Sequence, residues 1–360
     1  MTGHVRRREL LIRAASAGVA AALPLPALAQ VTGARVVVVG GGFAGATCAR
    51  TLKRLDPRLA VTMVEANPTR VFIACPFSNE VVVGLRELDE QQFRYDKLAS
   101  EGIPLNFSGA KSVDPQTRTV TLGDTAKLAY DRLVLAPGID FRWDALPGYS
   151  EAAAENMPHA WKAGPQTLLL RHQLEAMRDG GVVVIAVPAN PYRCPPGPYE
   201  RASLIAHYLK TKKPKSKLLI LDAKDTFSKQ KLFTKGWTAL YPDLIEWVAL
   251  SAGGKVTAVD ATAMILTTDF ATHKADVANV IPGQKAGHIA ELTGVADRTG
   301  WCPIDPVSFA STLQPNIHVI GDAAIAGAMP NRPLPRTPRL RSALPQWRRC
   351  WPAALPYRLS

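Results

Sequence analysis

Six consecutive residues, Gly40-Gly41-Gly42-Phe43-Ala44-Gly45, have the spacing of a G-x-G-x-x-G turn. A strand-like run rich in valine, 34–39, precedes the turn, and a helix-like segment, 46–55, follows it. Glycines at these positions allow a tight turn and a close approach of the backbone to a pyrophosphate, which the N-terminus of the helix also attracts. A second strand-like run, 59–64, ends in Glu65, where an acidic side chain can bind ribose hydroxyls. The pattern predicts a dinucleotide-binding domain.

Two segments far apart in the chain carry further residues that could complete this domain. Residues 130–138 read as a buried strand that ends in a small-residue turn at Gly138, and residues 316–323 read as a strand that delivers Asp322 beside a glycine. Both segments resemble parts of the FAD domain in flavoproteins with two dinucleotide-binding domains. The resemblance implies that Asp322 meets the ribityl chain or a phosphate of FAD. It also implies that the chain returns to its first domain after building a second one.

A second α/β unit lies between those segments. Strand-like runs at 181–187 and 217–221 alternate with helix-like runs at 166–177 and 200–209, which is the rhythm of another nucleotide-binding domain. Where the glycine turn should stand, residues 188–199 contain several prolines. Proline lacks the backbone N–H group that would bind a pyrophosphate. We therefore expect that this second domain does not bind NAD.

Two cysteine loops are the most specific motifs in the chain. One is Ala74-Cys75-Pro76-Phe77-Ser78-Asn79, and the other is Arg193-Cys194-Pro195-Pro196-Gly197-Pro198-Tyr199-Glu200. Together with the glycine turn, with Gly300-Trp301-Cys302-Pro303 and with Ile320-Gly321-Asp322-Ala323, they resemble the flavoprotein subunit of flavocytochrome c sulfide dehydrogenase. That family is related to the sulfide:quinone oxidoreductases. The resemblance runs from residue 34 to residue 330.

The resemblance implies roles for three residues. In the family, the cysteine at the position of Cys75 carries FAD through a thioether to the 8α-methyl group of the flavin, and such a tether raises the flavin potential. The cysteine at the position of Cys194 belongs to a redox-active disulfide that sulfide attacks. A persulfide then forms, and electrons pass through the flavin to a haem-bearing c-type cytochrome. Glu200 could move protons in this step, or it could be a plain exposed carboxylate at the start of a helix.

The other cysteines are expected to have no part in this chemistry. Cys48 lies on the packed side of the first helix-like segment, and Cys302 lies beside Trp301, so we expect both thiols to be packed inside the protein. The five cysteines include no C-x-x-C pair and no metal-like spacing. We therefore expect no metal site.

Residues 1–30 read as an export signal rather than as part of the fold. Arg6-Arg7-Arg8 precedes an alanine-rich apolar run, 10–28, that closes on Ala27-Leu28-Ala29. The order of arginines and leucines resembles a twin-arginine signal, with an ordinary secretory signal or an uncleaved anchor as the alternatives. No other apolar run has the length of a membrane span, so we expect the mature protein to be soluble and periplasmic.

The net charge of +13 does not indicate a nucleic-acid partner, because the two ends of the chain carry most of it. Residues 1–30 contribute +3 and residues 332–360 contribute +7, which leaves +3 for the body of the protein. The basic run at 210–217 is expected to be a solvated loop. The remaining length, about 330 residues, is enough for two domain cores.

The chain departs from the resemblance after Pro330. In the family, the second cysteine of the disulfide lies downstream of the Gly-Asp motif, in a segment that covers the flavin and helps to form the cytochrome interface. Residues 331–360 are instead rich in arginine and proline and contain Cys350. If one lost adenine is restored and codons are chosen freely, the neighbouring frame encodes an alanine-rich helix. We interpret 331–360 as a frameshift product, which leaves Cys194 without its family partner.

The predicted fold is therefore α/β, with two Rossmann-like dinucleotide-binding domains and a C-terminal cap domain that is missing or replaced. The FAD-binding domain is expected at 31–147 and 289–330, and a degenerate NAD-like domain at 148–288. The predicted function is periplasmic, FAD-dependent oxidation of sulfide or polysulfide, with haem only on a c-type cytochrome partner. The alternatives are a sulfide:quinone oxidoreductase and an inactive flavin-binding accessory protein of sulfur oxidation.

Overall fold

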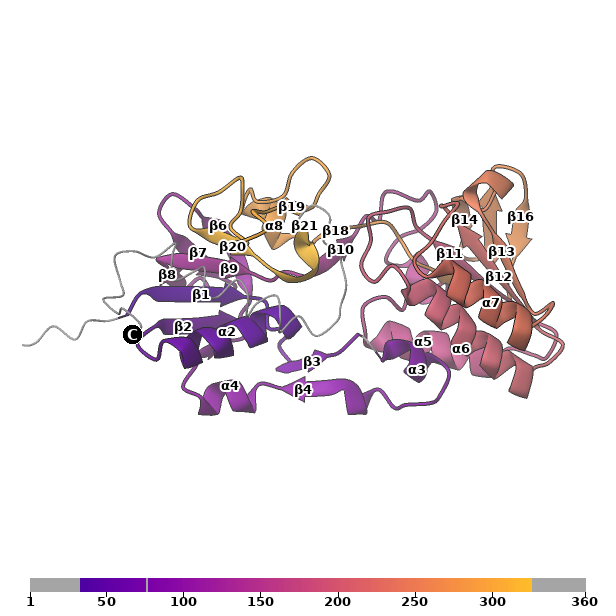
Figure 1. Cartoon of the computed structure of the whole chain (residues 1–360), viewed down its shortest axis with the longest axis horizontal. Coiled ribbons are helices and arrows are strands. Elements are labelled where there is room, and N and C mark those ends of the chain that lie inside the picture. Colours follow the sequence, from indigo (N-terminus) through magenta and orange to yellow (C-terminus); the bar gives the residue numbers. More distant parts are fainter. Residues whose placement is uncertain (1–32, 76, 326–360) are drawn as a thin grey trace, which may run out of the picture. The chain divides into compact units, whose positions relative to one another are not determined.

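The computed structural model describes residues 33–75 and 77–325, and two larger parallel sheets organise them (Figure 1). The first sheet has the strand order β20-β9-β1-β2-β5. Its valine-rich strands pair in register, with Val36 opposite Val61 and Val39 opposite Leu135. Its strands, all parallel, are β1 (Arg35–Val39), β2 (Ala60–Val64), β5 (Leu105–Asn106), β9 (Arg132–Leu135) and β20 (Ile317–Val319).

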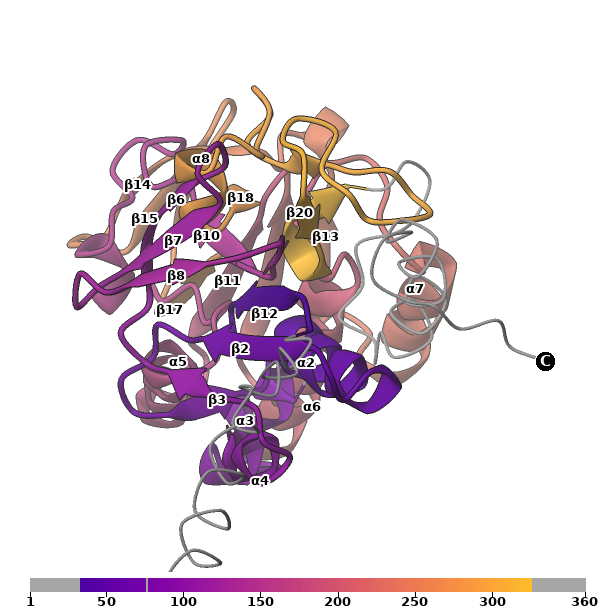
Figure 2. The same cartoon turned by 90° about the vertical axis from the view of Figure 1, so that its left-hand side faces the viewer.

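Side chains that alternate along β1 give each face of the first sheet its own core. Val36 and Val38 pack with helix α2 (Phe43–Leu55), whereas Val37 and Val39 pack with the three-stranded sheet β6-β7-β8. Figures 1 and 2 show α2 on one side of the first sheet and β6, β7 and β8 on the other. Because both faces are covered, β1 is a continuous apolar run rather than an alternating one. The covering strands are β6 (Ala110–Asp114), β7 (Thr119–Leu122) and β8 (Lys127–Ala129).

The second sheet has the strand order β13-β12-β11-β17, again with all strands parallel. Its central strand, β11, reads V-V-V-I-A-V and is buried at every position after the first. The strands are β11 (Val182–Val187), β12 (Lys217–Asp222), β13 (Ile245–Val248) and β17 (Val277–Val280). The helices of this unit are α5 (Pro165–Ala176), α6 (Gly197–Lys212) and α7 (Gln230–Leu240).

Two antiparallel strands carry the chain between the two sheets. The chain leaves the first sheet through β10 (Ile139–Phe141) and returns through β18 (Gln284–Ala286), and the two strands pair with each other. The returning chain then forms β20 at the edge of the first sheet. Asp322 follows β20, so the acid that the sequence singled out does return to the first sheet.

The remaining elements are short. The helices are α3 (Ser78–Val82), α4 (Asp96–Ser100) and α8 (Ile289–Leu292), and single 3-10 turns lie at Asp89–Gln91, Ala153–Glu155, Leu250–Ala252 and Gly321–Ala323. The strands are β3 (Val71–Ile73), β4 (Gln92–Arg94), β14 (Val256–Asp260), β15 (Ile265–Thr268), β16 (Thr272–Lys274), β19 (Cys302–Pro303) and β21 (Ala324–Ile325). Helix α3, which follows the Cys75 loop, packs against α5 and α6 of the second unit.

The predicted α/β fold class with two Rossmann-like sheets is confirmed by this topology. Two details of the sequence interpretation are wrong. Helix α6 begins at Gly197 rather than at Glu200, because proline is well tolerated in a first helical turn. The run 210–217 is a loop only at 213–216: Lys210 and Lys212 lie in the last turn of α6, where positive charges interact favourably with the helix dipole, and Lys217 begins β12.

Some predictions concern residues outside the described part of the chain. These are the export signal at 1–30, the tail at 331–360 with Cys350, and the loss of a C-terminal cap domain. Across 33–75 and 77–325, no helix is both long enough and apolar enough to pass through a membrane.

Candidate functional site

The turn between β1 and α2 has no room for a side chain at two of its glycines. Gly40 has a φ of +99°, and a Cβ on it would lie 2.2 Å from the carbonyl oxygen of Ala136. A Cβ on Gly45 would lie 1.8 Å from the carbonyl oxygen of Gly40. Both distances are far below van der Waals contact, so this turn requires glycine at both positions.

Open backbone donors stand at the start of α2. Its N-cap residue, Gly42, offers no side chain to the helix, and the first turn contains no acidic residue. The amides of Phe43 and Ala44 therefore lie at the positive end of a 13-residue helix. Beside the turn, the Glu65 carboxylate accepts a hydrogen bond from the amide of Gly41 at 2.5 Å. A phosphate group and a ribose would meet complementary partners here.

Glu65 is held against the turn by further contacts. Its Oε1 accepts from the amide of Asn67 at 2.9 Å, and its Oε2 accepts from the hydroxyl of Tyr95 at 3.5 Å. A Cβ on Gly41 would lie 2.7 Å from Oε2 of Glu65 and 2.6 Å from the hydroxyl oxygen of Tyr95. The carboxylate is thus fixed at the end of β2, where it can exchange a backbone partner for ribose hydroxyls.

Asp322 lies beside the start of α2 although it comes from the other end of the described chain. Gly321, with a φ of +80°, would bring a Cβ within 3.1 Å of the Cβ of Ala44. The Oδ2 atom of Asp322 lies 3.9 Å from the guanidinium of Arg193. Gly138 has a φ of +65° and open space where a Cβ would stand, so its conformation rather than crowding favours glycine at this exit from the first sheet.

The first sheet therefore gathers the features that FAD requires. A turn restricted to glycine, open helix amides and two carboxylates from distant segments meet at one edge of the sheet, and this arrangement fits a pyrophosphate and a ribose. The structure brings together the residues that the sequence singled out for this purpose: Gly40, Gly42, Phe43, Ala44, Gly45, Glu65 and Asp322.

The Cys75 loop reaches from the first sheet to the second unit. The Cys75 thiol is half-buried, and its Sγ donates to the carbonyl oxygen of Trp161 at 3.8 Å. The guanidinium of Arg193 donates to the same carbonyl oxygen. Two loops that are far apart in the sequence, one with Cys75 and the other with Cys194, therefore meet at Trp161.

Cys194 occupies a strained turn at the entrance to α6. Its φ is +57°, and its carbonyl oxygen accepts from the amide of Gly197 at 2.8 Å. A Cβ on Gly197 would lie 3.2 Å from the sulfur of Cys194, so glycine gives the thiol its room. Burial raises the pKa of the Cys194 thiol to about 12, with smaller increases from Cys75 and Glu200 and an opposing effect of Arg193. The effects of Cys75, Glu200 and Arg193 on this pKa show that all three side chains lie close to the Cys194 sulfur.

A buried arginine that the sequence reasoning missed supports both cysteine loops. Arg201 is only 2% exposed, and burial lowers its pKa to about 10, while the sulfurs of Cys75 and Cys194 act to raise it. Within the described residues, the acceptors of its hydrogen bonds are neutral: Asn79 Oδ1 at 2.9 Å, Asn279 Oδ1 at 2.8 Å, and the carbonyl oxygens of His159 at 3.1 Å and Ala160 at 2.6 Å. The sequence signal that could have revealed Arg201 is its place among the apolar residues of the helix-like run 200–209.

Glu200 lies in the first turn of α6 and is exposed. Its Oε2 accepts from Nδ2 of Asn79 at 2.7 Å, while Oδ1 of Asn79 accepts from Arg201. Asn79 is the last residue of the Cys75 loop motif, so one amide side chain links that loop to both charged residues of α6. The structure accommodates both readings of Glu200, as a helix-start carboxylate and as a group near Cys194.

The corresponding edge of the second sheet is filled by the chain itself. Asp222, at the end of β12, is fully buried and accepts from the hydroxyl of Tyr199 at 2.6 Å and the indole of Trp247 at 3.0 Å. It also pairs with Lys224 at 2.6 Å, and Phe227 stacks on Tyr199 with ring centroids 3.7 Å apart. An acid in this position binds the ribose of a dinucleotide in related folds, but here internal partners saturate it.

Cys48 and Cys302 are buried, as predicted. Both thiols are 0% exposed, and burial raises the pKa of each to about 12. Cys48 lies on the buried side of α2 and packs with β1, and Cys302 packs with the other face of the first sheet. Neither lies in the cluster around Trp161.

Two protein families match this chain. Residues 34–185 match the pyridine nucleotide-disulphide oxidoreductases, and residues 167–282 match the central part of the sulfide dehydrogenase (flavocytochrome c) flavoprotein chain. The first match includes the glycine turn and the Cys75 loop. The second includes the Cys194 loop and the buried Asp222.

Individual relatives agree with these matches. The sulfide dehydrogenase (flavocytochrome c) flavoprotein chain of Chlorobaculum thiosulfatiphilum is 60% identical over 47 residues, which are 13% of this chain and 94% of that sequence. The mitochondrial sulfide:quinone oxidoreductase of Mus musculus is 23% identical over 308 residues, covering 80% of this chain and 65% of that protein. The chain therefore spans a little less than two thirds of the mouse protein.

Solved structures show the same fold. The sulfide:quinone oxidoreductase of Aquifex aeolicus superposes with a TM-score of 0.69 at 22% identity, covering 81% of this chain and 69% of that one. A ferredoxin reductase from Rhodopseudomonas palustris superposes with a TM-score of 0.65 at 16% identity, covering 90% of this chain and 78% of the other.

Proposed function

The chain belongs to the family of flavocytochrome c sulfide dehydrogenase flavoproteins and the related sulfide:quinone oxidoreductases, and from that premise we propose that it is an FAD-dependent sulfide dehydrogenase. It oxidises sulfide through Cys194 and passes the electrons to a c-type cytochrome subunit in the periplasm. The observation that carries this proposal is the meeting of the Cys75 and Cys194 loops at the carbonyl oxygen of Trp161.

The residues around the glycine turn hold FAD in this proposal. The amides of 42–45 bind the pyrophosphate, Glu65 binds the ribose, and Asp322 meets the ribityl chain or a phosphate, with Gly138 at the exit of the same sheet. FAD supplies an acceptor for two electrons that can release them singly to a haem. Cys75 tethers the flavin through a thioether, for which its half-buried sulfur would give up one weak hydrogen bond within the described part of the chain.

Cys194 carries the sulfur chemistry. HS⁻ attacks the sulfur of Cys194 in a disulfide, the S–S bond breaks, and the partner sulfur leaves as a thiolate, so that Cys194 becomes a persulfide. The guanidinium of Arg193 stabilises anionic sulfur next to it, since its charge opposes the burial that disfavours a thiolate. Glu200 moves the proton of the incoming sulfide. In the family the partner sulfur comes from the segment after the Gly-Asp motif. In this sequence Cys350 is the one cysteine after that motif, so the step requires Cys350 in the partner's place; it lies outside the described residues.

A covalent flavin is the first test of the proposal. Acid-precipitated protein that has been washed in SDS should keep its flavin fluorescence, and Cys75→Ser should release all of it to the supernatant. Cys48→Ala is the matched control, because its thiol is buried between α2 and the first sheet, away from the Trp161 cluster. Yellow colour that leaves the unmodified protein on washing would contradict the tether at Cys75.

Sulfide oxidation itself is tested by anaerobic addition of sulfide. The flavin absorbance of the intact protein should bleach, and Cys194→Ser should keep the covalent flavin but lose the bleaching. A protein that binds flavin but never bleaches would be an accessory protein rather than an enzyme. This outcome would also dismiss the role of Cys194.

A quinone is the second candidate acceptor, and the similarity to the mouse and Aquifex sulfide:quinone oxidoreductases favours it. Sulfide-reduced protein is mixed in parallel with a c-type cytochrome and with a short-chain ubiquinone. Faster reoxidation by the cytochrome supports the dehydrogenase, and faster reoxidation by the quinone supports the alternative.

Export is tested by its signal. We expect the protein in the periplasmic fraction, and we expect the double change Arg7→Lys and Arg8→Lys to retain it in the cytoplasm, because the twin-arginine pathway reads that pair. Export that survives this double change would point to an ordinary secretory signal.

A further inference from the structure

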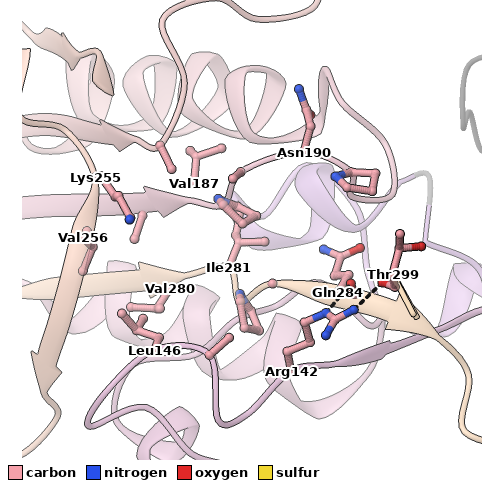
Figure 3. Close-up of a pocket in the computed structure, with 18 of the residues that line it drawn as sticks. Arg142, Leu146, Val187, Asn190, Lys255, Val256, Val280, Ile281, Gln284 and Thr299 are labelled. Carbon is pink, nitrogen blue, oxygen red and sulfur yellow. Dashed lines mark hydrogen bonds between the residues drawn. The ribbon is translucent and has the colours of Figure 1, made fainter. Parts of the chain in front are cut away.

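A cavity of about 280 Å³ opens at the carboxyl ends of β11 and β17 in the second sheet (Figure 3). Ligands of parallel α/β sheets bind at this edge. None of the residues that hold FAD or carry sulfur chemistry in the proposed function lines it. The walls are largely apolar and include Leu146, Val187, Val256, Val280 and Ile281.

One buried polar group in the wall of the cavity lacks a partner. Gln284 is 3% exposed, and its Oε1 accepts from the backbone amide of Arg193 at 2.9 Å. Its Nε2 has no hydrogen-bond partner among the described residues, and Figure 3 shows this nitrogen turned toward the cavity. A buried N–H group left unpaired costs about 1–3 kcal/mol, so the site favours a ligand that brings an acceptor.

The charges around the cavity have one sign. Lys255 extends from the wall opposite Gln284, and no hydrogen bond or ion pair joins its amine to another described residue (Figure 3). The guanidinium of Arg142 is already engaged with the carbonyl oxygens of Gln284 at 3.2 Å and of Thr299. Among the described residues that line the cavity there is no carboxylate. An anionic group would therefore meet an amine and an amide donor without repulsion.

The cavity itself offers little room for a dinucleotide. Its volume lies just below the range of about 300–1,000 Å³ typical of pockets for drug-sized ligands. The neighbouring strand end, where the adenosine half of a dinucleotide would extend, is filled by the cluster of Asp222, Tyr199 and Lys224. What remains is a short apolar chamber with donors on opposite walls.

We propose that this cavity binds a small anion with an apolar body, whose charged end accepts a hydrogen bond from Nε2 of Gln284, while the amine of Lys255 on the opposite wall adds positive charge. Two kinds of molecule share this chemistry: a short-chain aliphatic carboxylate and a short polysulfide anion. The site does not depend on the proposed function. Ligand binding is nevertheless expected to affect the Cys194 loop, because the Gln284 side chain that contacts the ligand also accepts a hydrogen bond from the amide of Arg193.

The test is isothermal calorimetry on the flavin-loaded full chain with acetate, butyrate and hexanoate. Affinity should rise about fourfold for each added methylene, because each enters the apolar chamber. Neutral hexanamide and cationic hexylamine should bind at least about tenfold more weakly than hexanoate. No detectable binding of hexanoate at about 10 mM, or equal binding of hexanamide, would overturn the proposal.

Two substitutions and one control locate the ligand. Lys255→Gln should weaken hexanoate about fivefold or more by removing the charge. Gln284→Glu should abolish binding, because it keeps the acceptor for the Arg193 amide but replaces the donor by a negative charge. Lys274→Gln, on the exposed strand β16, should change nothing. Thermal unfolding of each variant checks that it is folded, and unchanged affinity in both folded site variants would reject the site.

A second arm separates the two sources of the anion. Tetrasulfide is titrated anaerobically against bound hexanoate in Cys194→Ser, which prevents sulfur exchange at that residue. Displacement by tetrasulfide at lower concentrations than butyrate identifies polysulfide as the ligand, and failure to displace identifies the carboxylate. NADH that displaces hexanoate at still lower concentrations would overturn the small-anion assignment.

Discussion

The two strand-to-helix turns of this molecule stand at the same place in the same kind of sheet, yet their compositions are opposite. Between β1 and α2, the turn 40–45 is mostly glycine and presents open amides. Between β11 and α6, residues 188–196 contain four prolines and Cys194. The first turn offers backbone hydrogen-bond donors, whereas the second removes donors and fixes a sulfur in their place.

The sheet therefore fixes where each turn lies, and the residues of the turn decide which groups it presents. Both sheets bring a turn to their carboxyl edge, where a ligand or a reactive group can be reached. In the first sheet the acid at the end of the second strand, Glu65, faces the glycine turn. In the second sheet its counterpart, Asp222, is sealed among Tyr199, Trp247 and Lys224. In the proposed function, one fold thus serves a cofactor in one copy and sulfur chemistry in the other.

The largest effect is expected from a side chain placed in the glycine turn. We expect Gly45→Ala to abolish flavin binding and to destabilise the protein by more than about 4 kcal/mol, because its Cβ would lie 1.8 Å from the Gly40 carbonyl oxygen. Flavin absorbance and urea unfolding measure the two effects. Gly236→Ala in α7 is the matched control: a Cβ there meets nothing, so stability should rise by about 1 kcal/mol. A Gly45→Ala protein that is stable and still binds flavin would contradict the proposed role of the glycine turn.

The next largest effect concerns the support of the sulfur turn. Arg201→Met removes four buried hydrogen bonds and leaves the acceptors of Asn79 and Asn279 unpaired, so we expect a loss of about 2–5 kcal/mol in the free energy of unfolding. The exposed Arg178→Met is the control and should change stability by less than about 0.5 kcal/mol. Equal denaturation midpoints for the two variants would show that the buried cation does not hold the loops together.

Arg201 also marks the limit of what the sequence could predict. The glycine turn and Glu65 were found because a nucleotide site needs fixed residue types at fixed spacings, and such local patterns can be read directly. Asp322 was found because its segment resembles the corresponding part of flavoproteins with two dinucleotide-binding domains. Arg201, Asn79 and Asn279 act through contacts between segments about 80–120 residues apart, which no local pattern contains. The partner of Cys75 at Trp161 is a backbone carbonyl, and a carbonyl has no signature in the sequence at all.

A smaller effect concerns the ionisation of the Cys194 thiol. Burial raises the pKa of reduced Cys194 from an ordinary value of 9.0 to about 12, so at pH 8 its alkylation by iodoacetamide should be at least about tenfold slower than that of free cysteine. Between pH 9 and about 12 the unfolded chain loses this proton while the folded chain keeps it. Stability should therefore fall as pH rises through that window, and less so in Cys194→Ser. Mass spectrometry of the alkylated peptide and urea unfolding at several pH values test both parts.

The smallest effect is expected at Glu200, and it decides between the two readings of that residue. Glu200→Gln keeps an oxygen that can accept from Asn79, and the side chain is exposed, so the free energy of unfolding should change by less than about 0.5 kcal/mol. An amide cannot take up a proton, however, so the bleaching of the flavin by sulfide should slow by about tenfold, a modest effect for general-base catalysis because water also reaches the site. Asp56→Asn, which removes another carboxylate near a helix end but lies at the far end of α2, should leave the bleaching rate unchanged. If both variants bleach at the unmodified rate, Glu200 is only the hydrogen-bond partner of Asn79, and the proton of sulfide must leave directly to solvent.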